Sequence, residues 1–201
     1  LKIYGEILSE TNHENQEEID TILEQTEKLD FLIQSLVKLS RMESGIIAVH
    51  SEDTTITQML ESIQQQFNVK AREKNITLSL CDTDLHVLCD PKWTEEALGN
   101  IVDNAIKYTA CGGNVQVKAE QYSFFVKIDI IDDGIGIEKE EIPKIFGRFY
   151  RSLSVADQPG VGIGLFLARE IIQAQKGYIK VTSKRGKGST FSVFLPIAKK
   201  E

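Results

Sequence analysis

The chain has 201 residues, and its hydrophobic share of 41% is enough for a buried core. Its formal net charge of -7 argues against a nucleic-acid partner, because such a surface needs clustered basic side chains. The three cysteines show no CxxC spacing and predict a reducing compartment without a structural metal site.

The N-terminal part is predicted to be a helical hairpin. From Ile19 to Ser40, apolar residues recur at alternating spacings of three and four, which is typical of a bundle seam. A shorter amphipathic segment at 1–9 precedes it, and a polar stretch at 10–18 separates the two. Such a hairpin buries little alone, so we expect it to pair with a second copy as a four-helix bundle, or else to pack on the downstream domain.

The remainder predicts an α/β layer with a mixed sheet. The elements expected in chain order are a helix at 56–74, strands at 76–81 and 86–89, a helix at 91–109, strands at 115–119 and 125–131, a short helix at 138–146, a helix at 165–175, and a hairpin of strands at 178–183 and 190–196. The chain is therefore divided into a helical hairpin at 1–45, a linker at 46–53 and a second domain at 54–201.

One predicted helix carries a polar stripe opposite its apolar face. With a rotation of about 100° per residue, Asn100, Asn104 and Lys107 lie close together around the helix that begins at Pro91. An amide oxygen is a neutral ligand suited to Mg²⁺, and a lysine ammonium suits phosphate. The stripe predicts a site for magnesium-bound phosphates, although a solvated helix face would show the same pattern.

Three glycine-bearing segments follow this helix. Residues 132–136 (DDGIG) end an apolar strand, where a carboxylate can accept a hydrogen bond from an exocyclic amine beside a flat ring. Residues 160–164 (GVGIG) precede a helix, whose free N-terminal amides favour anions. Residues 186–190 (GKGST) turn the final hairpin. None fits GxxxxGK[ST], so with the polar stripe they predict an ATP site that is not a P-loop.

In this order the segments resemble the catalytic part of two-component sensor histidine kinases. Residues 100–108 (NIVDNAIKY) look like that family's N box, 145–151 (IFGRFYR) like its F box, and 188–191 (GSTF) like its last box, while DDGIG and GVGIG look like its glycine boxes. The resemblance covers essentially the whole chain, because the N-terminal hairpin looks like the dimerisation and phosphoacceptor domain. It implies an α/β sandwich of the GHKL (Bergerat) type with ATP and Mg²⁺ as ligands.

The resemblance also implies residue roles. Asn104 would ligate Mg²⁺, Asn100 and Lys107 would assist at the phosphates, and Asp132 would accept the adenine amine. The remaining implied ATP-binding residues are Tyr108, Gly134, Gly136, Ile137 and Thr190 around the base, Gly160, Gly162, Gly164 and Leu165 in the lid and the helix after it, and Arg151 near the γ-phosphate. Arg151 fits a salt-bridged lid residue equally well.

The implied function is transfer of the γ-phosphoryl group to a histidine of the dimerisation domain, for relay to an aspartate of a response regulator. The family's acceptor histidine stands in an HExxTP-like box that these 201 residues do not contain, and His13 lacks the Thr-Pro. We therefore expect the chain to be a fragment that binds nucleotide without phosphorylating itself. It is expected to face the cytoplasm, with the intact protein anchored in a bacterial inner membrane by upstream segments.

Two alternatives stay open. An ATPase clamp similar to gyrase, MutL or Hsp90 would share the asparagine helix and glycine boxes, but such proteins commonly carry a glutamate where Asn100 stands. A degenerate, non-catalytic dimeric scaffold would share the fold. The presence of Asn104 and Asp132 opposes the scaffold.

Overall fold

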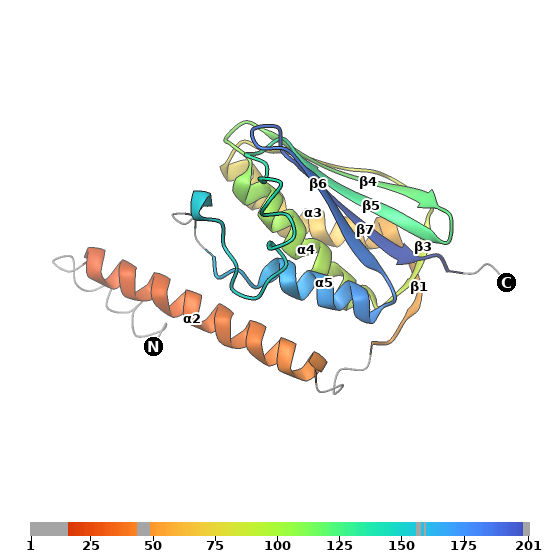
Figure 1. Ribbon diagram of the computed structural model, residues 1–201, viewed down its shortest axis with the longest axis horizontal. Coiled ribbons are helices and arrows are strands. Elements are labelled where there is room, and N and C mark those ends of the chain that lie inside the picture. Colours follow the sequence, from red (N-terminus) through yellow and green to blue (C-terminus); the bar gives the residue numbers. More distant parts are fainter. Residues whose placement is uncertain (1–15, 44–48, 156–157, 159, 199–201) are drawn as a thin grey trace. The chain divides into compact units, whose positions relative to one another are not determined.

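The computed structural model describes residues 16–43, 49–155, 158 and 160–198. The chain divides into two compact units, one with residues 1–48 and 155–161 and the other with residues 49–154 and 162–201. Figure 1 shows the elements of both along the sequence. Among the helices in this described part, none combines the length and apolar character needed to span a bilayer.

The first unit is described mainly by one long helix, α2 (Gln16–Glu43), of 28 residues. It begins inside the stretch expected to be a polar connection. Several of its large apolar side chains are exposed at bundle-like spacing, namely Ile22, Leu29, Ile33, Leu36 and Val37. The expected partner helix at residues 1–9 lies outside the described residues, so the hairpin and its dimer stay predictions.

The second unit is built on a five-stranded sheet in the order β2-β4-β5-β7-β6. The strands are β2 (Thr77–Leu80), β4 (Asn114–Tyr122), β5 (Phe125–Asp132), β6 (Tyr178–Ser183) and β7 (Ser189–Pro196). β2 pairs parallel with β4 and the other pairs are antiparallel, so the predicted mixed sheet is confirmed.

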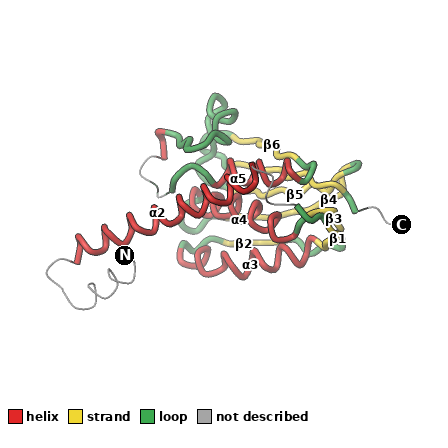
Figure 2. The backbone as a smooth tube through the Cα atoms, turned by 90° about the horizontal axis from the view of Figure 1, so that it is seen from below, coloured by secondary structure: helices red, strands yellow, loops and turns green. Residues whose placement is uncertain are grey.

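Three helices cover one face of this sheet, as Figure 2 shows: α3 (Ile56–Glu73), α4 (Pro91–Tyr108) and α5 (Gly164–Ala174). On β5, Val126, Ile128 and Ile130 alternate toward the helices and are almost completely buried. Burial of this continuous apolar layer is the main stabilising contribution to the unit.

Two local features differ from the sequence prediction. Strand β1 (Glu52–Thr55) begins inside the expected linker and pairs antiparallel with β3 (His86–Cys89). Residues 138–146 form successive turns with no helix element, as in the bonds from Glu141 N to Glu138 O (2.9 Å) and from Lys144 N to Glu141 O (2.7 Å). Pro143 has no N–H to donate, which disfavours a continuous helical ladder there.

Candidate functional site

Helix α4 presents the polar stripe predicted from the sequence. Asp90 caps its start by accepting a hydrogen bond from Trp93 N (3.2 Å), and Pro91 opens the first turn. Leu98, Ile101 and Val102 are buried on the opposite face. The three predicted side chains of the stripe, Asn100, Asn104 and Lys107, are half-buried, and so is the neighbouring Tyr108. The structure therefore leaves this face of α4 partly open to a ligand.

Asp132 ends β5 as a buried carboxylate with one side already occupied. Its Oδ1 accepts hydrogen bonds from Gly134 N (2.9 Å) and Ser189 N (3.2 Å). Among the described residues, Oδ2 makes no hydrogen bond, so it can accept one from a ligand amine. Burial raises the pKa of this carboxyl group, and the two backbone N–H groups partly oppose that rise.

The end of α4 and the loop after Asp132 meet directly. The carbonyl of Tyr108 accepts a hydrogen bond from Ile135 N (3.2 Å). A Cβ on Gly134 would lie 2.5 Å from the same carbonyl oxygen and 2.9 Å from Asp132 Oδ1. Only glycine permits this approach. The carboxylate of β5 and the last turn of α4 are thus neighbours.

The hairpin between β6 and β7 supports this loop from the other side. Ser183 Oγ accepts from Ile137 N (2.8 Å), donates to Gly188 O (2.9 Å) and lies 2.9 Å from Ser189 Oγ. Gly136 has a φ of 66°, and a Cβ there would lie 2.1 Å from Lys184 O. The sequence analysis missed both serines, although Ser189 stands directly after Gly188 in the last predicted box.

The register of β7 separates Thr190 from the Asp132 carboxylate. Ser189 pairs with Asp132, whereas Thr190 pairs with Ile131. Since side chains alternate between the faces of a sheet, Thr190 points to the face opposite Asp132. The structure therefore brings Ser189, and not Thr190, to the side chain of this aspartate.

Helix α5 begins against α4. A Cβ on Gly164 would lie 2.8 Å from Asn100 Oδ1, and Asn100 Nδ2 donates to Glu96 O (2.8 Å). The residue that precedes the helix is Ile163, which provides no side-chain cap. With no cap from this residue, the first-turn amides, including that of Leu165, suit an anion.

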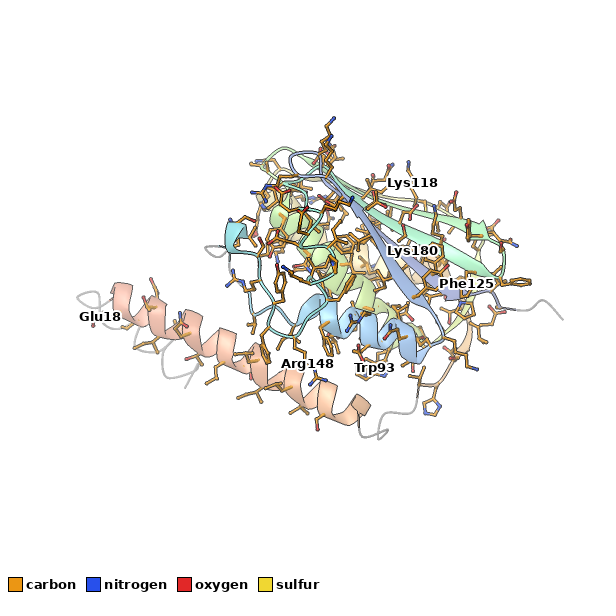
Figure 3. The ribbon with its side chains drawn as sticks, in the orientation of Figure 1. Glu18, Trp93, Lys118, Phe125, Arg148 and Lys180 are labelled. Atoms are coloured by element: carbon orange, nitrogen blue, oxygen red, sulfur yellow. The ribbon has the colours of Figure 1, made fainter. Side chains whose placement is uncertain are left out.

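The F-box residues contact α5 through stacked charges and rings. The Arg148 guanidinium lies 4.7 Å from the centre of the Phe166 ring, and Figure 3 labels Arg148 beside the start of α5. Arg169 lies 5.5 Å from the same ring and 5.6 Å from the Phe146 ring. A Cβ on Gly162 would lie 2.6 Å from Tyr150 O. These contacts fix the F box against the helix that follows the lid.

The positive charges near the stripe repel one another in the ligand-free protein. Burial lowers the pKa of Lys107, and the neighbouring charge of Arg151 lowers it further. Arg151 also acts on Tyr108, whose pKa burial raises. Two cations held close together favour a polyanionic ligand.

Gly160 has a φ of 135° and belongs to the other compact unit. Its expected role in ATP binding therefore stays a prediction.

No cluster of three or more His, Cys, Asp or Glu side chains in the described residues is placed to hold a metal ion. Mg²⁺ commonly keeps several waters and is completed by substrate phosphates, so it needs few ligands from the protein. An amide oxygen of Asn104 or Asn100 can supply a protein ligand at such a site.

The fold and the site together define an α/β nucleotide-binding domain of the GHKL class. The model of the histidine kinase-, DNA gyrase B- and HSP90-like ATPases matches residues 89–199, which is more than half of the chain. The chain therefore belongs to this ATPase family.

Individual relatives are sensor kinases. The chain is 32% identical to the sensor histidine kinase WalK of Bacillus subtilis, over 98% of this chain and 34% of that protein. It is 29% identical to the sensor protein kinase PmrB of Pseudomonas aeruginosa, over 85% of this chain and 36% of that protein. The chain thus spans about a third of the length of these curated relatives.

Solved structures show the same fold. The mycobacterial sensor histidine kinase MprB matches with a TM-score of 0.65 at 26% identity, over 74% of this chain and 98% of that chain. Full-length ShkA in complex with AMPPNP matches with a TM-score of 0.82 at 22% identity, over 98% of this chain and 42% of that chain. The histidine kinase ThkA in complex with the response regulator TrrA matches with a TM-score of 0.73 at 22% identity, over 94% of this chain and 52% of that chain.

Proposed function

We propose that the sheet-bearing unit binds ATP with Mg²⁺ and donates the γ-phosphoryl group to a histidine. The observation that carries this proposal is the hydrogen bond from Ile135 N to Tyr108 O (3.2 Å). Through it the amide-bearing face of α4 and the buried carboxylate of Asp132 become two ends of one site. A nucleotide has a matching pair of ends, an amine-bearing base and a chain of phosphates.

At the base end, Asp132 Oδ2 accepts a hydrogen bond from the exocyclic amine of adenine. Gly134 and Gly136 let the backbone approach the flat ring, and Ile137 and Tyr108 line it. Ser189 takes the role that the sequence analysis gave to Thr190, because it lies beside the carboxylate. A guanine base presents a carbonyl in place of that amine, so this end selects adenine.

At the phosphate end, Asn104 ligates Mg²⁺ and Asn100 assists. When bound, the ion neutralises charge on the phosphates. Lys107 and Arg151 add positive charge, and the first-turn amides of α5 at Gly164 and Leu165 donate to phosphate oxygens. Phosphoryl transfer requires positioning and charge neutralisation more than a protein nucleophile, which fits this set of groups.

We propose a histidine of the protein's helical dimerisation domain as the acceptor, and an aspartate of a response regulator as the next one. The names of WalK and PmrB and the ThkA–TrrA complex support this order of transfer. The exposed apolar row of α2 supports homodimerisation through the helices. The free cysteines Cys81, Cys89 and Cys111 fit the reducing cytoplasm, where ATP and response regulators occur.

Calorimetry with Mg²⁺ and ATP tests binding, with Asn104→Ala as the matched variant. Saturable binding to the native chain that weakens in the variant supports the proposal, and no binding to the native chain favours the scaffold. The intact protein, given labelled ATP, should form an acid-labile, base-stable phosphoprotein. Steady phosphate release without that species would instead indicate an ATPase clamp.

A further inference from the structure

One lysine from a neighbouring helix closes the C-terminal turn of α4. Lys74 directly follows α3, and its Nζ donates hydrogen bonds to the carbonyls of Ile106 (2.9 Å), Lys107 (2.9 Å) and Thr109 (2.8 Å). The side chain is half-buried. All three donor positions of the ammonium are therefore used on one stretch of backbone.

These bonds complete the last turn of the helix. The final carbonyls of a helix have no partner within it and need donors from elsewhere. Ala105 O accepts a hydrogen bond from Thr109 N (3.1 Å), and Tyr108 O accepts one from Ile135 N. The other three carbonyls of this turn accept their hydrogen bonds from Lys74 Nζ. The positive charge also complements the negative end of the helix dipole. The backbone of Lys74 is held as well, because Gly112 N donates a hydrogen bond to Lys74 O (3.1 Å).

The carbonyl that contacts the glycine loop lies between two carbonyls that Lys74 holds. Tyr108 O can reach Ile135 N only if the peptide planes of Lys107 and Thr109 keep their directions. We infer that Lys74 is a positioning residue, which fixes the register between α4 and the loop at 132–136. This inference rests on the proposed function, because that register sets the distance between the phosphate end and the base end of the site.

A ligand that spans both ends should depend on this register, and a ligand that uses one end should not. ATP contacts the loop with its base and α4 with its phosphates, so a shift between them weakens one set of contacts whenever the other is made. Adenosine contacts the base end alone. A role limited to general stability would affect both ligands alike or neither.

The test compares Lys74→Met and Lys74→Arg with Lys70→Met. Lys70 lies one turn earlier on α3 and bridges the same two helices, but through an exposed ion pair with Asp103. Binding of MgATP is measured by calorimetry and of adenosine by NMR titration, at a temperature where every variant is folded. We expect Lys74→Met to weaken MgATP about tenfold and adenosine less than about twofold, because a tenfold change in affinity corresponds to about the free energy of one hydrogen bond from a charged group.

Lys74→Arg should recover most of the affinity for MgATP, since a guanidinium also donates to several carbonyls, and Lys70→Met should bind like the native chain. Equal losses for both ligands, or no loss in Lys74→Met, would overturn the inference. Hydrogen exchange of the Ile135 amide provides a ligand-free measurement, and it should quicken in Lys74→Met alone. A native chain that binds no MgATP rejects the proposed function, and the exchange rate then still decides whether Lys74 holds the register.

Discussion

Gly164, the first residue of α5, lies so close to α4 that a Cβ on it would be 2.8 Å from Asn100 Oδ1. That oxygen is the end of a side chain and not backbone, so Asn100 can rotate away. The glycine at position 164 therefore leaves room for the Asn100 carboxamide, and it matters less for the packing of the two helices. It allows the polar face of α4 to meet the uncapped start of α5.

Gly164→Ala is expected to fold normally and to bind MgATP about tenfold more weakly, because the displaced carboxamide no longer faces the phosphates. Alanine also has the higher helix propensity, so the unfolding free energy should not fall. Calorimetry and thermal unfolding measure the two effects. Gly99→Ala is the control within α4, since a Cβ there would lie 3.5 Å from the Phe67 ring in ordinary contact. Equal affinities in both variants would contradict this role.

Asp132→Asn separates stability from binding. Burial raises the pKa of this carboxyl above 3.8, so its charged form is unfavourable in the folded state at neutral pH. This destabilisation is fully present above the raised folded pKa, and it is relieved as pH falls through that pKa toward the unfolded value. The neutral variant should therefore unfold at equal or higher urea than the native chain at pH 7, and this difference should shrink as pH falls toward 4.

The same variant should bind MgATP about 30-fold more weakly or worse, because the amide that replaces Oδ2 donates toward the adenine amine instead of accepting from it. Calorimetry at pH 7 measures this loss. A variant that keeps its affinity would remove Asp132 from the base end of the site. A variant that loses both affinity and stability would show that the carboxylate is a structural group.

The local patterns of the sequence predicted most of the sheet-bearing unit. The proline predicted where α4 begins, the apolar spacing predicted which face of α4 is buried, and the apolar run before Asp132 predicted that this carboxylate ends a strand. Each of these features lies within one helix or strand, so the spacing of apolar residues along that element is enough to predict it. The family match confirms the ATPase fold that the boxes implied.

The features that the sequence did not predict depend mainly on how separate helices and strands pack against one another. Thr190 was named and Ser189 was missed because a motif does not reveal which face of a strand a residue takes, whereas the pairing of Ser189 with Asp132 does. Lys74 was missed because its three acceptors lie more than thirty positions away in the chain. Residues 138–146 form turns in place of the expected helix, and Pro143, which has no N–H to donate, disfavours that helix.

Lys107→Met is expected to stabilise the ligand-free protein while weakening nucleotide binding. Burial, and then Arg151, lowers the pKa of this lysine, so its charge is unfavourable in the folded state. That unfavourable contribution is fully present below the lowered folded pKa and is relieved as pH rises from there toward 10.5. At neutral pH the gain is about 0.5 kcal/mol, a small value because the ammonium is half-exposed.

Thermal unfolding with and without MgATP measures both effects, and the stabilisation by nucleotide should be smaller in Lys107→Met than in the native chain. Lys118→Met, at an exposed position on β4, is the charge-matched control. A ligand-free Lys107→Met that melts below the native chain would show that the lysine stabilises the fold, and its assignment to the phosphates would lose its electrostatic argument.

The exposed apolar row of α2 predicts self-association of this chain. Ile33 is 51% exposed in the single chain and lies four residues from Leu29, which is 54% exposed. Ile33→Glu places a charge on the row and should convert a dimer into a monomer in sedimentation, because a buried unpaired carboxylate is strongly unfavourable. Gln34→Glu, one position around the same helix, adds the same charge off the row and should stay dimeric. A native chain that sediments as a monomer at high concentration would contradict the assignment of α2 to a dimer interface.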